Sequence, residues 1–143
     1  MLTRVTFALL VLVFGANLAL AEEAEPETTI VSIGITDRKV DKTDLMKRMM
    51  LPKPRFDSPG IAYGWVAHAK KGDHVEVHLK KDGESLMHNL RDVTEDDADV
   101  LLMAGKTGVP AGGWPKGQYT AKVTVTRGDK VVDEKETDPI PFE

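Results

Sequence analysis

Residues 119–126 read YTAKVTVT, and this stretch carries the pattern that decides the fold. Aromatic or apolar side chains occupy every second position, and threonine or lysine fills the positions between them. A period of two is typical of a β-strand with one buried face and one wet face. Residues 127–130 then supply turn chemistry around Gly128, and Val131-Val132 begin a return strand. The segment therefore predicts an antiparallel hairpin.

The same period continues upstream of this hairpin. Asp82-Gly83 is a strong signal for a tight turn between two further strands. Ile140 and Phe142 stand next to prolines and predict an edge strand or a capping tail. Because a single sheet of this size would leave an apolar face in water, we expect an all-β fold of about seven strands, either a two-sheet antiparallel sandwich or a closed barrel. Its other strands are predicted over residues 30–36, 61–68, 74–80, 85–93 and 99–104.

Residues 38–59 do not follow the strand pattern and form an irregular, methionine-rich insertion. Thr43 is predicted to cap a short helix over residues 44–50, which the prolines at 52 and 54 would end. The spacing places Met46, Met49 and Met50 on one helical face. Flexible thioethers suit adaptable binding surfaces, so these methionines are candidates for contact with a partner. The alternative is that they cover an open end of the core.

The N-terminus predicts export. Arg4 precedes an apolar run over residues 7–20, and Ala19-Leu20-Ala21 supplies the small residues that signal peptidase requires. The run is short for a membrane span, so we expect cleavage after Ala21 and no stable membrane anchor afterwards. The predicted organisation is a signal peptide (1–21), a flexible acidic leader (22–29) and one domain (30–143) in the periplasm or outside the cell.

Composition restricts the chemistry further. The 143 residues are 41% hydrophobic and 29% charged, as in a folded soluble domain. The chain has no cysteine, which excludes disulfides, iron–sulfur clusters and a lipoprotein anchor. Removing residues 1–21 leaves 18 basic and 23 acidic residues, a net charge of −5. A mildly acidic chain without an evident basic cluster is not expected to bind nucleic acid or anionic lipid.

Residues 113–125 (GWPKGQYTAKVTV) and 128–132 (GDKVV) resemble the late-strand signature, GWPxGxY, of small bacterial immunoglobulin-like periplasmic proteins. The layout of residues 56–65 and 81–83 is similar too, so the resemblance covers about Ile30 to Phe142. It implies an immunoglobulin-like, two-sheet antiparallel sandwich, with Tyr119 as a tyrosine corner and Gly117 at a positive φ beside it. The cysteine pair of true immunoglobulin domains is missing.

Metal binding, above all of copper, is an alternative function. His74 and His78 share a strand and lie about 13 Å apart, so they cannot chelate one ion. Only a set that crosses the hairpin, formed from His78, Met87 and His88, could converge, and imidazole and thioether are good copper ligands. The structural alternative is that the histidines are solvated polar residues.

We find no sequence motif for catalysis: no nucleophile elbow, zinc-protease helix or phosphate loop is present. The sequence therefore predicts a non-enzymatic module without a cofactor. We expect it to bind another envelope or secreted protein, with Trp114 as a further candidate anchor beside the methionines. A structural component of an envelope assembly is a second alternative to metal binding.

Overall fold

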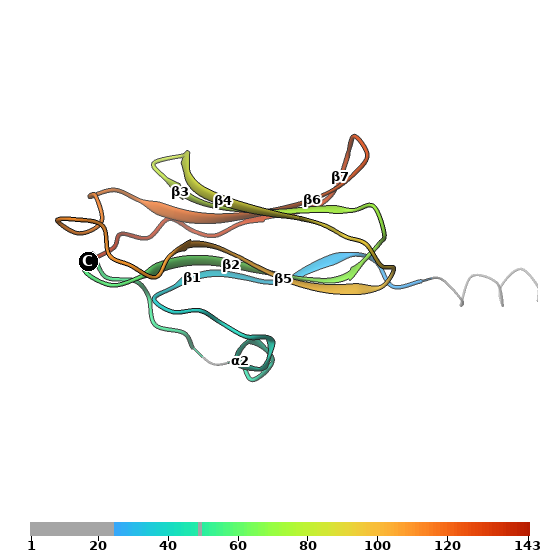
Figure 1. The fold of residues 1–143 in the computed structure, drawn as a ribbon, viewed down its shortest axis with the longest axis horizontal. Helices are drawn as coiled ribbons and strands as arrows, with labels where there is room; N and C mark the ends of the chain where they lie inside the picture. The colour runs from blue at the N-terminus through green and yellow to red at the C-terminus, as the bar shows by residue number, and fades with distance from the viewer. Residues whose placement is uncertain (1–24, 49) are drawn as a thin grey trace, which may run out of the picture.

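Two antiparallel β-sheets pack face to face in the computed structural model, which describes residues 25–48 and 50–143 (Figure 1). The predicted sandwich of seven strands is confirmed. The predicted signal peptide and Met49 lie outside the described residues. The first sheet has the order β1-β2-β5 and is formed by β1 (Thr29–Thr36), β2 (Gly60–Ala69) and β5 (Ala98–Lys106). The second has the order β4-β3-β6-β7 and is formed by β3 (His74–Lys81), β4 (Glu84–Asp92), β6 (Tyr119–Arg127) and β7 (Lys130–Glu136).

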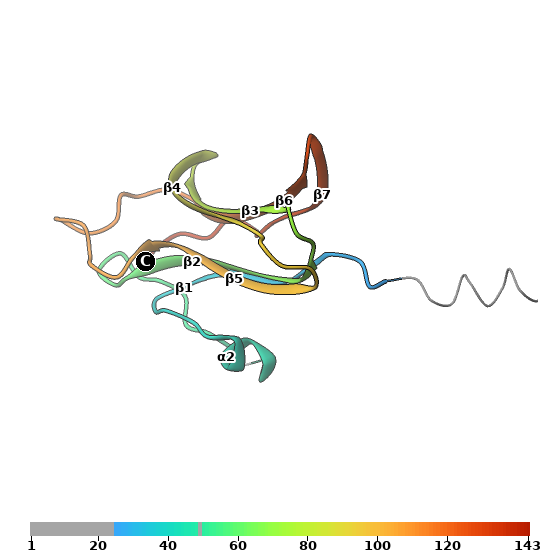
Figure 2. The ribbon, with the colours of Figure 1, turned by 45° about the vertical axis from the view of Figure 1, so that its right-hand side comes forward.

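The turn between β3 and β4 determines where the fourth strand lies. Asp82 and Gly83 have φ values of 49° and 84°, and two successive positive φ angles are the requirement of a type I′ hairpin. β4 consequently pairs with β3, whereas in constant-type immunoglobulin domains the fourth strand joins the sheet of the first, second and fifth. The tips of the β3–β4 and β6–β7 hairpins rise away from the sandwich (Figure 2).

The core lies between the sheets and follows the alternation in the sequence. The inward residues of β3 and β6 are fully buried, and their neighbours on the same strands are partly exposed. Gly64 of β2 leaves room for the side chain of Val123 on the opposite sheet. The central inward-facing residues are Ala62, Val66, Val75, Val77, Leu79, Val100, Leu102, Tyr119, Ala121, Val123 and Val125.

Side chains join the two sheets at their edges. Asp133 of β7 accepts a hydrogen bond from the Ile30 N–H at 2.9 Å, and Lys135 donates one to the Ile30 carbonyl at 2.9 Å. On the other side, the Asn89 amide donates to the Met103 carbonyl at 3.0 Å. These contacts satisfy backbone groups that an edge strand would otherwise expose to pairing with another chain.

An ion pair with a buried carboxylate connects the β2–β3 turn, the end of β6 and the residues before β1 at one end of the sandwich. The carboxylate of Asp73, which is fully buried, accepts bonds from Arg127 Nε at 2.7 Å and Nη2 at 2.9 Å, and from the Lys70 N–H at 2.8 Å. Arg127 Nη2 also donates to Thr28 at 3.1 Å, whose hydroxyl donates to the His68 carbonyl at 2.6 Å. The guanidinium lowers the pKa of Asp73. The last residues of the predicted leader therefore pack on the domain.

The helix in the insertion differs from the prediction. α2 (Lys42–Met46) begins after Asp41, because the Asp41 and Asp44 side chains each accept a bond from the other's backbone N–H and form a capping box. Thr43 is therefore inside the helix, and the prediction that it caps the helix is wrong. The helix ends before Lys47, and Arg48 has a φ of 52°, which α-helix cannot accommodate. Within the described residues, no helix has the length and apolarity needed to cross a membrane.

Candidate functional site

The insertion packs on the outer face of the β1-β2-β5 sheet (Figure 1). Val40, Ile61 and Tyr63 are buried, at 4%, 3% and 9% exposure, yet they lie outside the cluster between the sheets. They form a second, thinner apolar layer, and burial raises the pKa of Tyr63. Lys42 forms an ion pair with Asp99 of β5, which fastens α2 to the sheet.

Residues 52–56, which lead the insertion back toward β2, are also held in place. The buried Thr36 hydroxyl donates to the Pro52 carbonyl at 2.8 Å. Four residues later, the Phe56 carbonyl accepts the backbone N–H of Trp114 at 2.8 Å. Both ends of this short segment are thus fixed to the sandwich, which serves as a rigid base for the insertion.

A groove of about 510 Å³ lies between α2 and the outer face of the sheet. Of the two predicted methionines that the structure describes, Met46 lines the groove and is 63% exposed, and Met50 lies outside its lining and is 98% exposed. They do not cover an open end of the core, which was the alternative to a surface role. The residues lining the groove are Val31, Ser32, Leu45, Met46, Arg48, Tyr63 and Trp65.

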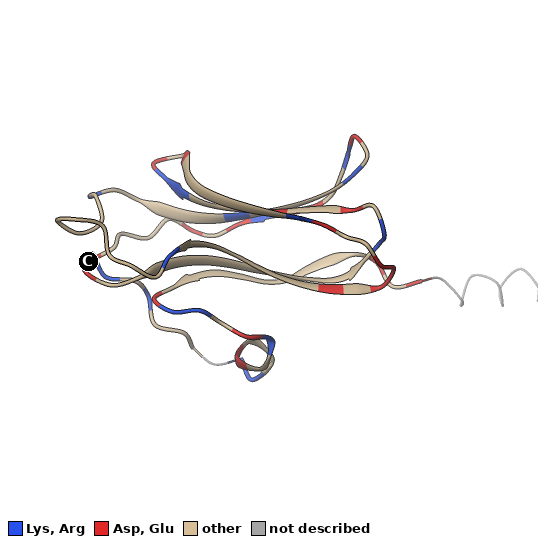
Figure 3. Ribbon diagram, viewed as in Figure 1, with Lys and Arg blue, Asp and Glu red and all other residues tan. Residues whose placement is uncertain are grey.

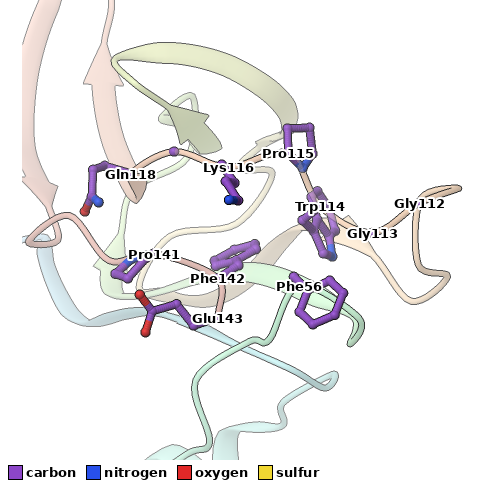
Figure 4. Close-up of a pocket in the computed structure, with 11 residues that line it drawn as sticks. Phe56, Gly112, Gly113, Trp114, Pro115, Lys116, Gln118, Pro141, Phe142 and Glu143 are labelled. Atoms are coloured by element: carbon purple, nitrogen blue, oxygen red, sulfur yellow. The ribbon is translucent and has the colours of Figure 1, made fainter.

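A larger cavity, of about 690 Å³, opens at the end of the sandwich (Figure 4). Its walls come from Phe56, the 112–118 loop and the C-terminal residues 141–143. Trp114 is only 5% exposed, and its indole N–H donates to the Ser58 carbonyl at 2.8 Å. Trp114 therefore forms the wall of the cavity, and Phe56, at 48% exposure, is the accessible aromatic ring that the sequence reasoning missed.

Tyr119 holds the cavity wall together. Its ring is fully buried, stacks on Phe142 at a centroid distance of 3.8 Å, and its hydroxyl donates to the Pro115 carbonyl at 2.5 Å. Its backbone N–H and C=O both bond to Ile140. The hydroxyl-to-backbone bond expected of a tyrosine corner is therefore present, and the burial of the ring raises the pKa of Tyr119.

Gly117 has the positive φ that was expected beside this corner, at 159°, a backbone conformation that residues with a side chain rarely adopt. Close packing is a second reason for glycine here, because an added Cβ would lie 2.7 Å from a carboxylate oxygen of Asp82. Asp82 must approach closely because that carboxylate accepts the Gln118 N–H at 2.9 Å, a bond that lowers the pKa of Asp82.

The predicted metal ligands converge only in part. His78 and His88 are direct cross-strand partners, and their rings stack at 5.5 Å with an interplanar angle of 25°. Met87 packs against the core, on the other face of β4. Across residues 25–48 and 50–143, no three histidine or carboxylate side chains are grouped as a metal site. The hairpin thus brings together two imidazoles without the thioether.

His78 makes two other contacts on the same open face. Its Nδ1 lies 2.6 Å from the Ser85 hydroxyl, and its Nε2 lies 3.1 Å from Glu76. A serine, a histidine and a carboxylate in a row are the parts of a nucleophilic triad. Here all three lie on a flat, solvated sheet face beside Lys122, the partner of His78 on β6, and the row resembles an ordinary polar surface network.

The insertion is basic, while the rest of the described chain is acidic. Residues 38–59 contain seven basic and three acidic residues, a net +4. Residues 25–37 and 60–143 contain 11 basic and 18 acidic residues, a net −7. Figure 3 shows lysine and arginine along the insertion and acidic residues gathered at the turn before β5. The expectation of a chain without a basic cluster is therefore wrong for this segment.

No protein-family model matches the chain, and no curated protein matches its sequence. The resemblance to small bacterial immunoglobulin-like periplasmic proteins accordingly stays a prediction. A functional assignment has to be argued from the arrangement of this chain's own residues.

Proposed function

We propose that the protein is an exported, non-catalytic binding module of the cell envelope that contacts another protein through the insertion and the groove beside it. The observation that carries this proposal is the distribution of exposed apolar side chains. Among the described residues, eight large apolar side chains are strongly exposed, and four of them lie on the insertion or line its groove. These four are Val31, Met46, Met50 and Phe56.

Such exposure contributes nothing to folding. A methionine that is 98% exposed buries no surface in the free protein, so its position at the tip of an anchored segment is better explained by a contact made elsewhere. Methionine, phenylalanine and arginine are enriched in protein–protein interfaces, and thioethers adapt to irregular partner surfaces. The sandwich would act as a rigid base that limits the entropy lost on binding.

Export rests on the predicted signal peptide at residues 1–21, and the periplasm is the proposed location. Binding of a second protein also accounts for the form of the insertion. The Thr36–Pro52 bond closes a loop over residues 37–51, and the exposed methionines lie within that loop, while the Phe56–Trp114 bond fixes the chain that follows it. A purely structural connection between β1 and β2 would not need about twenty residues, since hairpin loops of 2–5 residues are common.

Quantitative immunoprecipitation of the untagged protein from the cells that produce it tests this proposal. The double variant Met46→Ser, Met50→Ser is compared with the double variant Leu86→Ser, Val131→Ser. Leu86 on β4 and Val131 on β7 are similarly apolar and are 45% and 51% exposed. We expect the first variant to lose its co-purifying protein by about tenfold or more, and the second to retain it. Equal recovery from both variants would refute the proposed surface.

A further inference from the structure

We infer that the partner presents an acidic polypeptide surface to the basic arm of the insertion, which we define as Lys47, Arg48 and Lys53. This inference rests on the proposed function, and it adds the chemistry of the partner. All three side chains are exposed, and none has an ion-pair partner in the part of the chain that the structure describes. Of the other four basic residues of the insertion, those at 38, 42 and 55 each pair with a carboxylate of this chain, and Lys39 has no ion-pair partner among the described residues.

The basic arm is also locally uncompensated. No acidic residue occurs between Lys47 and Phe56, although acidic residues exceed basic ones in the remainder of the chain. Lys47 and Arg48 are neighbours in the sequence and repel one another, and no carboxylate of the described residues pairs with any of the three side chains of the arm. A complementary carboxylate surface on a partner would offset that repulsion.

The contrast between arm and body gives such a contact its direction. The body has a net charge of −7 and disfavours an acidic partner overall, whereas the insertion has a net charge of +4 and attracts one. Charge complementarity of this kind mainly accelerates encounter and selects the orientation of docking. Met46 directly precedes the arm and Met50 lies within it, at 63% and 98% exposure, and they would supply the apolar contact once the partner has arrived.

An acidic protein fits this surface better than an anionic membrane. Helices that lie in a membrane interface present a long apolar face, often with tryptophan or leucine. α2 has only five residues and ends at Met46, so it does not present a long apolar face. A flat lipid surface would also face the acidic body of the protein, whereas a protein partner can confine its negative charge to the area of contact.

Charge reversal with a matched control tests the inference. The triple variant Lys47→Glu, Arg48→Glu, Lys53→Glu is compared with Lys71→Glu, Arg91→Glu, Lys130→Glu. The control replaces two lysines and one arginine that are likewise exposed and without ion-pair partners among the described residues. We expect recovery of the co-purifying protein to fall about tenfold or more in the first variant and to change less than about twofold in the second.

A zero-length carbodiimide cross-linker identifies the contact, because it joins lysine amines to carboxylates in direct contact. We expect mass spectrometry to find Lys47 or Lys53 joined to aspartate or glutamate of the partner. Thermal unfolding midpoints monitor folding, and Lys47→Gln, Arg48→Gln, Lys53→Gln gives a second variant that should lose binding to a smaller extent. Vesicles of phosphatidylglycerol should not co-sediment with the unaltered protein.

The outcomes separate the two proposals. If Met46→Ser, Met50→Ser abolishes recovery while both charge-reversed variants behave alike, the binding surface stands and the acidic partner is refuted. Co-sedimentation with phosphatidylglycerol vesicles that depends on the basic arm, with no co-purifying protein, would overturn the inference in favour of a membrane.

Discussion

Replacing Asp73 with alanine removes the central acceptor of the network that joins the β2–β3 turn, the end of β6 and the residues before β1. The side chain is fully buried and accepts three hydrogen bonds, two of them from the Arg127 guanidinium at 2.7 and 2.9 Å. Removing one partner of a buried ion pair typically costs about 3–5 kcal/mol. The Arg127 side chain is 47% exposed, so water would solvate it again in the variant. We therefore expect a loss of about 2–4 kcal/mol in the free energy of unfolding.

Urea denaturation at pH 7, followed by tryptophan fluorescence and circular dichroism, measures this loss. The midpoint should fall by roughly 1–2 M urea if the slope of the transition is unchanged. Asp129→Ala is the matched control, because Asp129 is an exposed carboxylate without an ion-pair partner among the described residues. It should change the free energy by less than about 0.5 kcal/mol. A loss of similar size in both variants would refute the reasoning from burial and hydrogen bonding.

Three further predictions concern the pH dependence of stability, the tyrosine corner and copper binding. The folded-state pKa of Asp73 is lowered, so its stabilising effect is present above the unfolded-state pKa of about 3.9 and is lost as the pH falls through the folded value. The difference in unfolding free energy between the natural protein and Asp73→Asn should therefore shrink below about pH 4. A difference that stays constant from pH 7 to pH 2 would contradict this. Tyr119→Phe removes one buried hydrogen bond and should cost about 0.5–1.5 kcal/mol in urea denaturation, with no effect counting against the tyrosine corner. In calorimetric titration with Cu(II), the double variant His78→Ala, His88→Ala should lower the affinity for copper, because it removes the two stacked imidazoles. The single variant Met87→Ala should leave the affinity unchanged, and a tenfold loss in that variant would show that the thioether reaches the metal.

The strands could be predicted because each one shows its two faces in its own sequence. Tyr119 to Val125 and Val75 to Leu79 alternate so regularly that only one register buries their apolar side chains. The Asp82-Gly83 turn was equally local, since two positive φ angles require these residue types. The pairing of β4 with β3 follows from that turn, and it places β4 in the second sheet.

The insertion was harder to predict because its structure depends on contacts distant in the sequence. Asp41 and Asp44 form the helix cap that was predicted at Thr43. Trp114 was predicted as an interface anchor because of its residue type, whereas it is 5% exposed, packs edge-on against Phe142 and donates to the Ser58 carbonyl. The basic character of residues 38–59 needed only a local count of charges, which the net charge of the whole chain concealed.

Contact between the insertion and a partner in living cells tests the account most directly. A photo-crosslinking amino acid is placed at position 50 in one version of the protein and at position 131 in another. Position 50 lies on the insertion and is 98% exposed, and position 131 lies on β7 and is 51% exposed. We predict a discrete protein adduct from position 50, at a yield about tenfold or more above that from position 131. Equal yields from the two positions, or an adduct from position 131 alone, would contradict the claim that this sandwich presents its insertion for binding.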